Sequence, residues 1–256
     1  MKEIALTKKL ISAAVAILAF GAFSSQVFCA PGGSLQKGRK PQPQAQNAQK
    51  RNSVENFQRY EDANKSVDKP PVAVFMGDSI TDNWARMDKD FFEKNNYLGR
   101  GISGQVTCQM LARLRPDAIE LKPKVVLILA GTNDIARNQG YITNENICRN
   151  IVSMCELLKH NGIVPVICSV LPAHKYGWRP NIDAIPAIAD LNSKLKAYAQ
   201  SNGIEYLDYY SALVDERKGL TKEDSADGVH PTASCYREKL GPMAKAKIDE
   251  ILKNKK

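Results

Sequence analysis

The chain has 256 residues, of which 43% are hydrophobic and 25% are charged. This composition favours one globular domain of about 180 to 190 residues with an appendage. The formal net charge of +9 comes from 36 Lys and Arg against 27 Asp and Glu; residues 1–70 hold 11 and 5 of these, which leaves 25 and 22 for residues 71–256. Because the positive excess lies mostly before residue 71, we expect no nucleic-acid groove in the rest of the chain.

Residues 1–30 have the layout of a secretory signal peptide. Three lysines stand near the start, and residues 10–23 then form a 14-residue run without a charge. A bilayer span needs about 20 apolar residues, so this run favours export, with an uncleaved anchor as the alternative. We therefore expect a periplasmic or extracellular protein that has no stable membrane span after signal cleavage.

Cleavage after either Ser24 or Cys29 would leave a small residue at the cut. Lipid anchoring through Cys29 is disfavoured, because the bulky Phe28 stands where such sites want a small residue. The six cysteines of the chain show no paired CxxC spacing, so no zinc site is predicted. We expect them mainly as small buried hydrophobes and leave open whether any of them pair.

Residues 31–70 are predicted to be a linker, disordered or partly helical. Residues 32–53 are rich in Gln, Lys, Pro, Gly and Asn and lack apolar periodicity, as expected for a tether. A polar helix can follow over residues 54–68, before Pro70 and Pro71 stop it. The remaining residues, 71–256, are predicted to form one domain.

Strand-like and helix-like segments alternate from residue 72 onward, which is typical of βαβ units around a parallel sheet. Strands are predicted at residues 72–76, 97–102, 125–130, 163–170 and 204–207, with the pure aliphatic run at 125–130 as the clearest and 97–102 as a weak one. Helical spacing predicts helices at residues 82–94, 106–121, 143–160, 185–201 and 234–252. Together they predict a three-layer α/β sandwich around a five-stranded parallel sheet of flavodoxin-like topology. We expect right-handed connections and take 2-1-3-4-5 as the strand order.

The first predicted strand runs directly into Gly77, Asp78 and Ser79. Ligands of open α/β sheets bind beyond the carboxyl ends of the strands, so a serine here can be a nucleophile. It can also be a helix N-cap, and when Ser79 is taken alone the cap is the better interpretation. Gly104 and Asn133 follow the next two strands, where each is also compatible with an ordinary loop or turn.

Asp227 and His230 stand three residues apart, just before the last predicted helix. This offset lets the carboxylate reach one ring nitrogen and leaves the other free to face Ser79, as a general base requires. The alternative is a turn-capping Asp227 beside an incidental His230. Of the other two histidines, His160 ends a helix and His174 lies in a loop without an acidic partner, so His230 is the preferred base.

Four segments of the chain resemble, in order, the four blocks of the SGNH hydrolases, also called the GDSL family. These segments are Gly77-Asp78-Ser79, Gly104, Gly131-Thr132-Asn133-Asp134 and Asp227-Gly228-Val229-His230. The resemblance covers about residues 71–253, that is, the whole predicted SGNH hydrolase domain. Residues 100–104 also resemble the branch related to platelet-activating-factor acetylhydrolase. Two departures from that branch, Gly99 for Asn and Cys235-Tyr236 for Gly-Tyr, lie outside the catalytic set.

The resemblance implies a role for each matching residue. Ser79 would attack an ester carbonyl, His230 would take and return the proton, and Asp227 would orient His230. The oxyanion would be held by the backbone N–H groups of Ser79 and Gly104 and by the side-chain amide of Asn133. The family chemistry implies neither a metal nor an organic cofactor.

These features predict a secreted serine esterase for a small-molecule or carbohydrate ester, with acetyl on carbohydrate favoured by the subfamily likeness and the export signal. Asp78, Tyr176 and Trp178 are weaker candidates for substrate contacts, and the two aromatic residues could equally belong to the core. A lysophospholipase or thioesterase with the same triad is the nearest alternative, and an inactive binding protein is another. A flavodoxin-like nucleotide binder is disfavoured, because residues 77–81 hold one glycine. The oligomeric state stays open.

Overall fold

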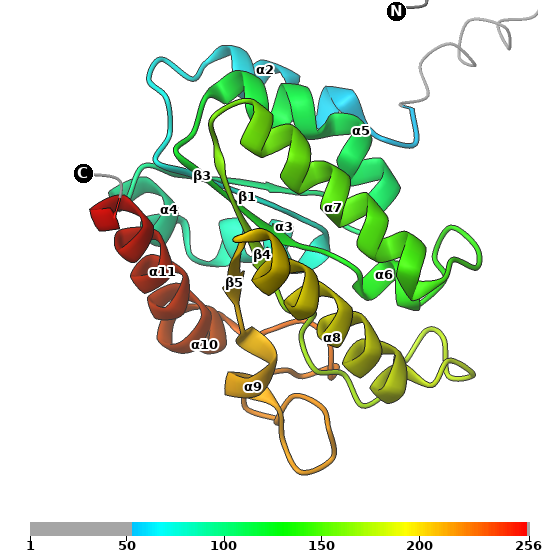
Figure 1. Cartoon of the computed structure of the whole chain (residues 1–256). Coiled ribbons are helices and arrows are strands. Elements are labelled where there is room, and N and C mark those ends of the chain that lie inside the picture. Colours follow the sequence, from blue (N-terminus) through cyan, green and yellow to red (C-terminus); the bar gives the residue numbers. More distant parts are fainter. Residues whose placement is uncertain (1–52, 255–256) are drawn as a thin grey trace, which may run out of the picture. The chain divides into compact units, whose positions relative to one another are not determined.

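The computed structural model describes residues 53–254; the predicted signal peptide and most of the predicted linker lie outside this range. Within it, strands and helices alternate along the chain (Figure 1). The strands are β1 (Ala73–Gly77), β2 (Tyr97–Gly101), β3 (Val125–Leu129), β4 (Val164–Cys168) and β5 (Glu205–Leu207). The longer helices are α3 (Ser79–Met87), α5 (Thr107–Asp117), α7 (Asn144–His160), α8 (Ala184–Asn202) and α11 (Gly241–Asn254). Shorter helical segments are η2 (Phe57–Arg59), α2 (Glu61–Lys65), α4 (Lys89–Lys94), η3 (Ile119–Leu121), α6 (Thr132–Ile135), α9 (Tyr209–Leu213), α10 (Ala233–Cys235) and η4 (Tyr236–Leu240).

The strands of residues 53–254 form one parallel, five-stranded sheet in the order β2-β1-β3-β4-β5. The predicted fold class and the predicted strand order are thus confirmed. In the register of β1, Gly77 lies opposite Gly101 of β2 and Leu129 of β3. The carboxyl ends of these three strands are therefore level, so the loops that follow them begin side by side.

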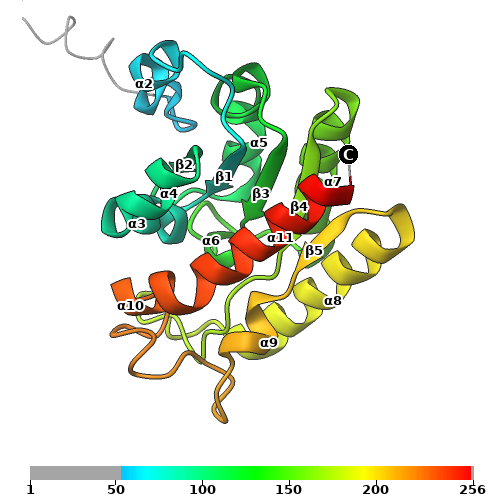
Figure 2. The same ribbon diagram turned by 90° about the vertical axis from the view of Figure 1, so that its left-hand side faces the viewer.

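Two apolar layers cover the sheet, one on each face. Alternate residues of β1 illustrate the division, since Val74 and Met76 pack in one layer and Phe75 packs in the other. The first layer is completed by α5, α7 and α8, and the second by α3, α4 and α11. Figure 2 shows α11 crossing the near face of the strands while α5 and α7 lie behind them. Each fully buried large side chain contributes about 1.5 to 3 kcal/mol, which explains why the strands are continuous apolar runs.

The helix predicted over residues 82–94 is instead two helices, α3 and α4, which meet at Asp88. The backbone of Asp88 leaves the helical region, with φ −136° and ψ 57°. The first of these helices also begins earlier than predicted, at Ser79, because the side chain of Asp78 caps it. Similarly, the predicted last helix comprises α10, the π-helical turn η4 and α11.

Residues 53–70, which fall in the predicted linker, make polar contacts with the sheet and with α5. The Asn64 amide donates to the carbonyl oxygen of Pro116 at 3.1 Å, and the Tyr60 hydroxyl donates to the carbonyl oxygen of Gly101. Gln105 donates in turn to the carbonyl oxygen of Glu55 at 2.8 Å. The domain boundary at residue 71 stays a prediction, but these contacts place the segment against α5 and the end of β2.

The cysteines of the described range are free thiols. Cys155, Cys168 and Cys235 are buried in the apolar layers, whereas Cys108 is exposed. Between residues 53 and 254 no helix has both the length and the apolarity needed to cross a bilayer.

The end of β2 packs directly on the first turn of α3, and a glycine makes this approach possible. A Cβ atom added to Gly101 would lie 2.2 Å from the backbone nitrogen of Asp82 and 2.6 Å from the carbonyl oxygen of Asp78. Both are main-chain atoms, which cannot move aside as a flexible side chain can. The position of the α3 N-terminus, and with it that of Ser79, depends on the absence of a side chain at residue 101.

The substitution Gly101→Ala is expected to lower the free energy of unfolding by at least about 2 kcal/mol, because the added methyl group overlaps backbone atoms. Urea denaturation measures this loss. Gly177→Ala is the control: its Cβ would have no neighbour within 4 Å, and we expect a change within about 0.5 kcal/mol. Equal stabilities for the two variants would show that the contact between β2 and α3 relaxes at little cost.

Candidate active site

Ser79 lies where β1 meets α3, and it is the first residue of that helix. The N-cap is Asp78, whose Oδ1 accepts the backbone N–H of Ile80 at 2.9 Å. The interpretation of Ser79 as the N-cap is therefore wrong, because the carboxylate of Asp78 accepts the hydrogen bond that a capping side chain accepts. The hydroxyl of Ser79 is left available for another partner.

That partner is His230, which is 151 residues away in the sequence. Ser79 Oγ lies 2.9 Å from His230 Nε2, and His230 Nδ1 lies 2.7 Å from Asp227 Oδ2. A carboxylate can only accept, so the contact with Asp227 places the ring proton on Nδ1. The lone pair of Nε2 then faces the serine hydroxyl, which is the arrangement in which an imidazole acts as a general base. The structure thus brings together the three residues that the sequence analysis chose for the triad.

Asp227 is held by the turn that it begins. Its Oδ1 accepts the backbone N–H groups of Val229 at 2.9 Å and His230 at 2.8 Å, and the Ser225 hydroxyl at 3.1 Å. Partial burial alone would raise the pKa of Asp227, but the hydrogen bonds from His230 and Val229 outweigh it and lower the pKa to about 2. The carboxylate is consequently ionised at neutral pH, where it can stabilise a positive imidazolium.

Gly104 and Asn133 lie beside Ser79, as the level strand ends require. Gly104 has φ +81°, a left-handed conformation that favours glycine, and a Cβ there would meet only open space. The Asn133 amide nitrogen is 3.0 Å from the carbonyl oxygen of Gln105 and 3.3 Å from Asp78 Oδ2. These contacts hold the amide of Asn133 between the loops that follow β1 and β2.

An open cavity of about 360 Å³ joins these groups. Trp178 is 40% exposed and forms part of the wall. It is the one large apolar side chain among the lining residues, which are Ser79, Asn83, Ser103, Gly104, Asn133, Asn138, Trp178 and His230. The cavity therefore has one aromatic wall, and its other lining side chains carry amide, hydroxyl or imidazole groups.

Two weaker candidates for substrate contacts do not reach this cavity. Asp78 is 1% exposed and Tyr176 is fully buried, and neither lines the cavity. Asp78 serves as the helix cap, and Tyr176 packs under Trp178 with 5.3 Å between the ring centroids. The prediction that these two side chains contact the substrate directly is therefore wrong. They lie behind the cavity and support its wall.

Asn138 lines the cavity but was missed in the sequence analysis. Its amide nitrogen donates to Asn133 Oδ1 at 2.7 Å, and its own Oδ1 accepts the indole N–H of Trp178 at 3.0 Å. Asn138 therefore fixes both the orientation of the Asn133 amide and the position of the aromatic wall. Its only sequence signal is a second amide side chain five residues after Asn133, which does not distinguish it from an ordinary loop asparagine.

Comparison with known proteins identifies the family of the chain. The family described as GDSL-like Lipase/Acylhydrolase matches residues 75–238, a range that includes Ser79, Gly104, Asn133, Asp227 and His230. The chain belongs to this GDSL-like lipase/acylhydrolase family. The resemblance drawn from the sequence blocks is thereby confirmed, and membership implies that the protein is an ester hydrolase.

Two solved structures from Bacteroides resemble this GDSL acylhydrolase over most of its length. A Bacteroides fragilis protein, provisionally assigned as an acylhydrolase, is 44% identical, with a TM-score of 0.75, and the match covers 78% of this chain and 99% of that one. A GDSL-like lipase of Bacteroides thetaiotaomicron is 41% identical, with a TM-score of 0.74 and coverages of 77% and 99%. An uncharacterized lipoprotein of Bacillus subtilis is 31% identical over 78 residues, which are 29% of this chain and 32% of the lipoprotein.

Burial at the strand ends of this GDSL acylhydrolase raises the pKa of two carboxyl groups other than that of Asp227. Burial raises the pKa of Asp78 to about 6, against the opposing effect of the Ile80 N–H. Burial likewise raises the pKa of Asp134 to about 6, although the hydroxyl and the backbone N–H of Thr107 both donate to it. In the folded protein both groups hold a proton more tightly than an ordinary aspartate, whose pKa is about 3.9.

The substitution Asp78→Asn is expected to flatten the pH dependence of stability. A raised carboxyl pKa means that the folded state binds more protons than the unfolded state between about pH 4 and 6, so stability falls as pH rises through this window. Asparagine keeps a capping oxygen and does not titrate. The variant should therefore avoid about 2 to 3 kcal/mol of the wild-type loss in the free energy of unfolding between pH 4 and 7.

Urea titrations at several pH values measure this difference. The control is Asp62→Asn, which alters a fully exposed carboxylate and should follow the wild-type curve. Parallel curves for wild type and Asp78→Asn would contradict the raised pKa of Asp78.

Proposed function

We propose that the protein is a secreted serine esterase that works through an acyl-enzyme intermediate on Ser79. The observation that carries the proposal is the 2.9 Å contact between Ser79 Oγ and His230 Nε2, with His230 held at its other nitrogen by Asp227. This contact puts a nucleophile next to a base of fixed tautomer, at the edge of the sheet where ligands of such folds bind.

The reaction begins with attack of Ser79 Oγ on the ester carbonyl carbon while His230 Nε2 takes the hydroxyl proton. The resulting imidazolium gives this proton to the alkoxide oxygen as the C–O bond breaks, and the alcohol leaves. Water then attacks the acyl-serine, His230 takes a proton from it and returns it to Ser79 Oγ, and the free acid departs. The ionised Asp227 stabilises the imidazolium in both halves of the reaction.

The negative oxygen of each tetrahedral intermediate requires hydrogen-bond donors. We assign the backbone N–H groups of Ser79 and Gly104 and the side-chain amide of Asn133 to this role, with the amide exchanging its long 3.3 Å contact with Asp78 Oδ2 for the oxyanion. The first N–H lies in the opening turn of α3, where the helix dipole also favours negative charge. Loss of one such donor typically costs about 10²- to 10³-fold in rate.

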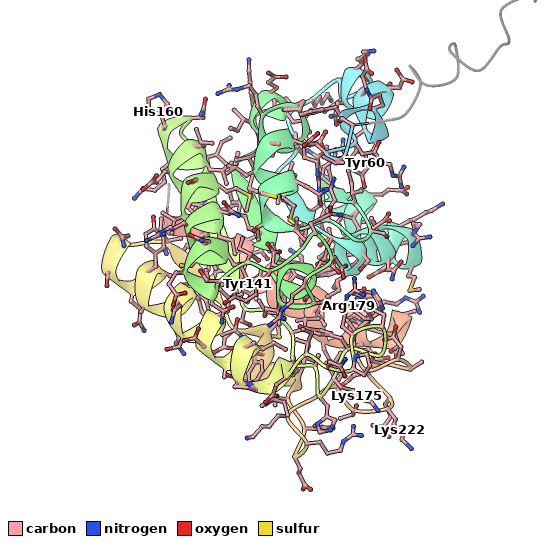
Figure 3. All side chains as sticks on the ribbon, turned by 90° about the vertical axis from the view of Figure 1, so that its right-hand side faces the viewer. Tyr60, Tyr141, His160, Lys175, Arg179 and Lys222 are labelled. Atoms are coloured by element: carbon pink, nitrogen blue, oxygen red, sulfur yellow. The ribbon has the colours of Figure 1, made fainter. Side chains whose placement is uncertain are left out.

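The proposed substrate is a short acyl ester, with acetyl on carbohydrate favoured. A long acyl chain needs an extended apolar wall, whereas Trp178 is the one large apolar side chain around the cavity, and the other lining side chains are amides, hydroxyls and the imidazole of His230. Trp178 supplies one aromatic surface on which a sugar ring could stack. Arg179 follows Trp178 in the chain, and Figure 3 shows Arg179 with Lys175 and Lys222 below it on the same face of the molecule.

Export is part of the proposal, on the basis of residues 1–30. The partial match to a Bacillus subtilis lipoprotein is compatible with export. A carbohydrate ester outside the cytoplasm would be consistent with both the leader and the polar cavity.

Single substitutions of the triad are expected to remove nearly all activity toward an aryl acetate. Ser79→Ala and His230→Ala should each lower kcat by about 10³-fold or more, and the double variant should lose little beyond that, because the two groups act as one unit. Asp227→Asn should cost about 10²- to 10⁴-fold, because the tautomer of His230 is no longer fixed. His160→Ala, at the far end of α7, is the control and should match wild type.

Steady-state kinetics at one pH measure these effects. Retention of wild-type kcat by Ser79→Ala would make the catalytic assignment wrong. An inactive wild-type protein that still binds esters would favour the alternative of a binding protein.

Acyl-chain length and Trp178 test the substrate. We expect kcat/KM for an acetyl ester to exceed that for an octanoyl ester of the same alcohol by at least about 10-fold, because one or more methylenes find no apolar wall. Trp178→Ala should lower kcat/KM for acetylated sugars by about 3- to 10-fold and leave an aryl acetate nearly unchanged. Tyr141→Ala, an exposed aromatic residue outside the cavity, is the matched control. Faster turnover of long chains would favour a lysophospholipase or thioesterase instead.

A further inference from the structure

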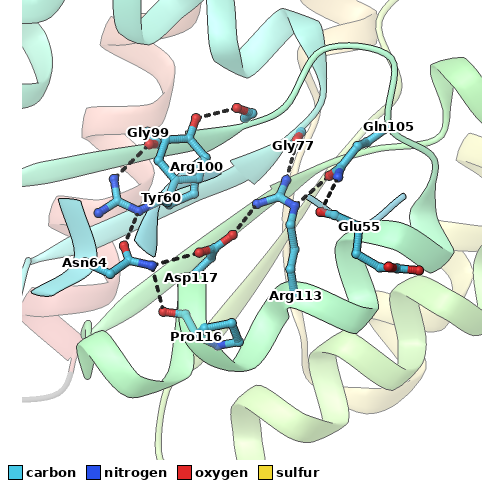
Figure 4. Close-up of polar contacts among 11 residues, drawn as sticks. Glu55, Tyr60, Asn64, Gly77, Gly99, Arg100, Gln105, Arg113, Pro116 and Asp117 are labelled. Atoms are coloured by element: carbon cyan, nitrogen blue, oxygen red, sulfur yellow. Dashed lines mark hydrogen bonds and ion pairs between the residues drawn. The ribbon is translucent and has the colours of Figure 1, made fainter. Parts of the chain in front are cut away.

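One buried arginine contacts two of the loops that carry the proposed oxyanion donors. Arg113 of α5 has no exposed surface. Its Nη2 donates to the carbonyl oxygen of Gly77 at 2.9 Å, its Nε donates to Gln105 Oε1 at 2.6 Å, and its Nη1 forms an ion pair with Asp117 at 3.0 Å (Figure 4). The planar guanidinium therefore fixes three groups from different parts of the chain relative to one another.

The hydrogen bonds from Arg113 to Gly77 and to Gln105 end next to the three proposed donors. Gly77 precedes Ser79 by two residues, and its carbonyl oxygen also accepts the N–H of Ile102 at 3.1 Å. Gln105 directly follows Gly104, and the backbone carbonyl oxygen of Gln105 accepts the Asn133 amide at 3.0 Å. A shift of Arg113 would thus be passed to the N–H of Ser79, to the N–H of Gly104 and to the amide of Asn133.

The segment before β1 closes this network from the other side. The Gln105 amide donates to the carbonyl oxygen of Glu55 at 2.8 Å, and the Asn64 amide donates to Asp117 Oδ1 at 2.8 Å (Figure 4). Gln105 and Asp117, the two side-chain partners of Arg113, are thereby held by residues of the N-terminal segment. Their side chains cannot turn away from the guanidinium without loss of buried hydrogen bonds.

The energetics favour a positioning role over a purely stabilising one. Removal of two charges from water offsets most of the attraction between Arg113 and Asp117, so a buried ion pair contributes little net stability compared with apolar residues of similar size. What apolar residues cannot supply is a set of donors aimed at Gly77 and Gln105. Lysine cannot supply it either, because a single ammonium group lacks the planar fork.

We propose that Arg113, whose partners Gln105 and Asp117 are held by Glu55 and Asn64, is a positioning residue that keeps the three oxyanion donors directed at one point. The inference rests on the proposed function of Ser79, Gly104 and Asn133. It predicts that loss of Arg113 weakens transition-state stabilisation, which lowers kcat, while the cavity wall that binds the substrate is left in place, so that KM changes little.

Arg100 offers a matched control. It is also buried, at 5% exposed, and its guanidinium stands 4.8 Å above the Tyr60 ring. Its hydrogen bonds end at Asn64 Oδ1 and at the carbonyl oxygen of Gly99, so it touches neither Gly77 nor Gln105 and reaches the Arg113 network only indirectly, through Asn64 and Asp117. Arg113→Met and Arg100→Met therefore remove comparable buried arginines with different partners.

The experiment measures kcat and KM for an aryl acetate, together with thermal unfolding, in wild type, Arg113→Met, Arg113→Lys, Arg100→Met and Gln105→Met. Assays run well below each melting temperature. Both Arg113 variants should lose about 10- to 100-fold in kcat, up to the loss of one oxyanion donor, with KM within about 3-fold. Arg100→Met should lose stability but keep kcat within about 3-fold. Gln105→Met, which leaves the ion pair of Arg113 intact, should lose about 10-fold in kcat.

Wild-type kcat in folded Arg113→Met, full rescue by Arg113→Lys, or an equal loss of kcat in Arg100→Met would overturn the proposal. If the Arg113 variants do not fold, Gln105→Met decides, and an unchanged kcat in that variant counts against the proposal. Ser79→Ala is assayed in parallel: if it retains activity, the proposed function itself is wrong, whereas an inactive Ser79→Ala beside fully active Arg113 and Gln105 variants refutes only the positioning role.

Discussion

The carbonyl oxygen of Gly77 accepts two hydrogen bonds where β1 ends, one from the N–H of Ile102 and one from Arg113. The first sets the loop after β2 against the loop after β1, and the second ties both to α5. Everything around the candidate nucleophile depends on this junction, because Ser79 follows two residues later. The junction also needs a glycine: a Cβ at residue 77 would lie 2.1 Å from Thr81 Oγ1 and 2.9 Å from the carbonyl oxygen of Leu129.

The strand ends hold buried polar side chains, whose removal from water costs free energy, beside the two large apolar layers that cover the sheet. Four polar side chains at this edge of the sheet are almost completely buried: Asp78, Asn133, Asp134 and Arg113. Exclusion of water raises the pKa of both carboxyl groups among them, Asp78 and Asp134. Such groups contribute little to folding by themselves. The two apolar layers on the sheet supply the stability that allows this edge to persist, and the hydrogen bonds within it then specify one geometry rather than several.

The two halves of the proposed reaction are served by different parts of the fold. The acyl end meets backbone and amide donors on rigid strand ends, where small errors in position cost most in rate. The proposed function assigns the alcohol of the ester to the loops that carry Asn138 and Trp178, and loops tolerate changes of sequence and length more readily than strands do. Asn138 connects the two, since it holds both the Asn133 amide and the indole of Trp178. The substrate class thus depends on the loops, and the ester chemistry depends on the sheet.

The sequence by itself determined the fold class, the alternation of strands and helices, and the residue types at the strand ends, because local periodicity and turn residues encode these features. It also singled out His230 and Asp227, since their three-residue spacing is a local property. Only the tertiary structure decided that Asp78, and not Ser79, caps α3 and that Asp78 and Tyr176 lie behind the cavity. It alone brought Asn138, Arg113 and the segment before β1 into contact with the loops of the proposed donors. Those relations join residues that are far apart in the chain, and they depend on how helices and loops pack rather than on any local pattern. In Ser79 the two kinds of information meet: its place after β1 is local, and its contact with His230 spans 151 residues.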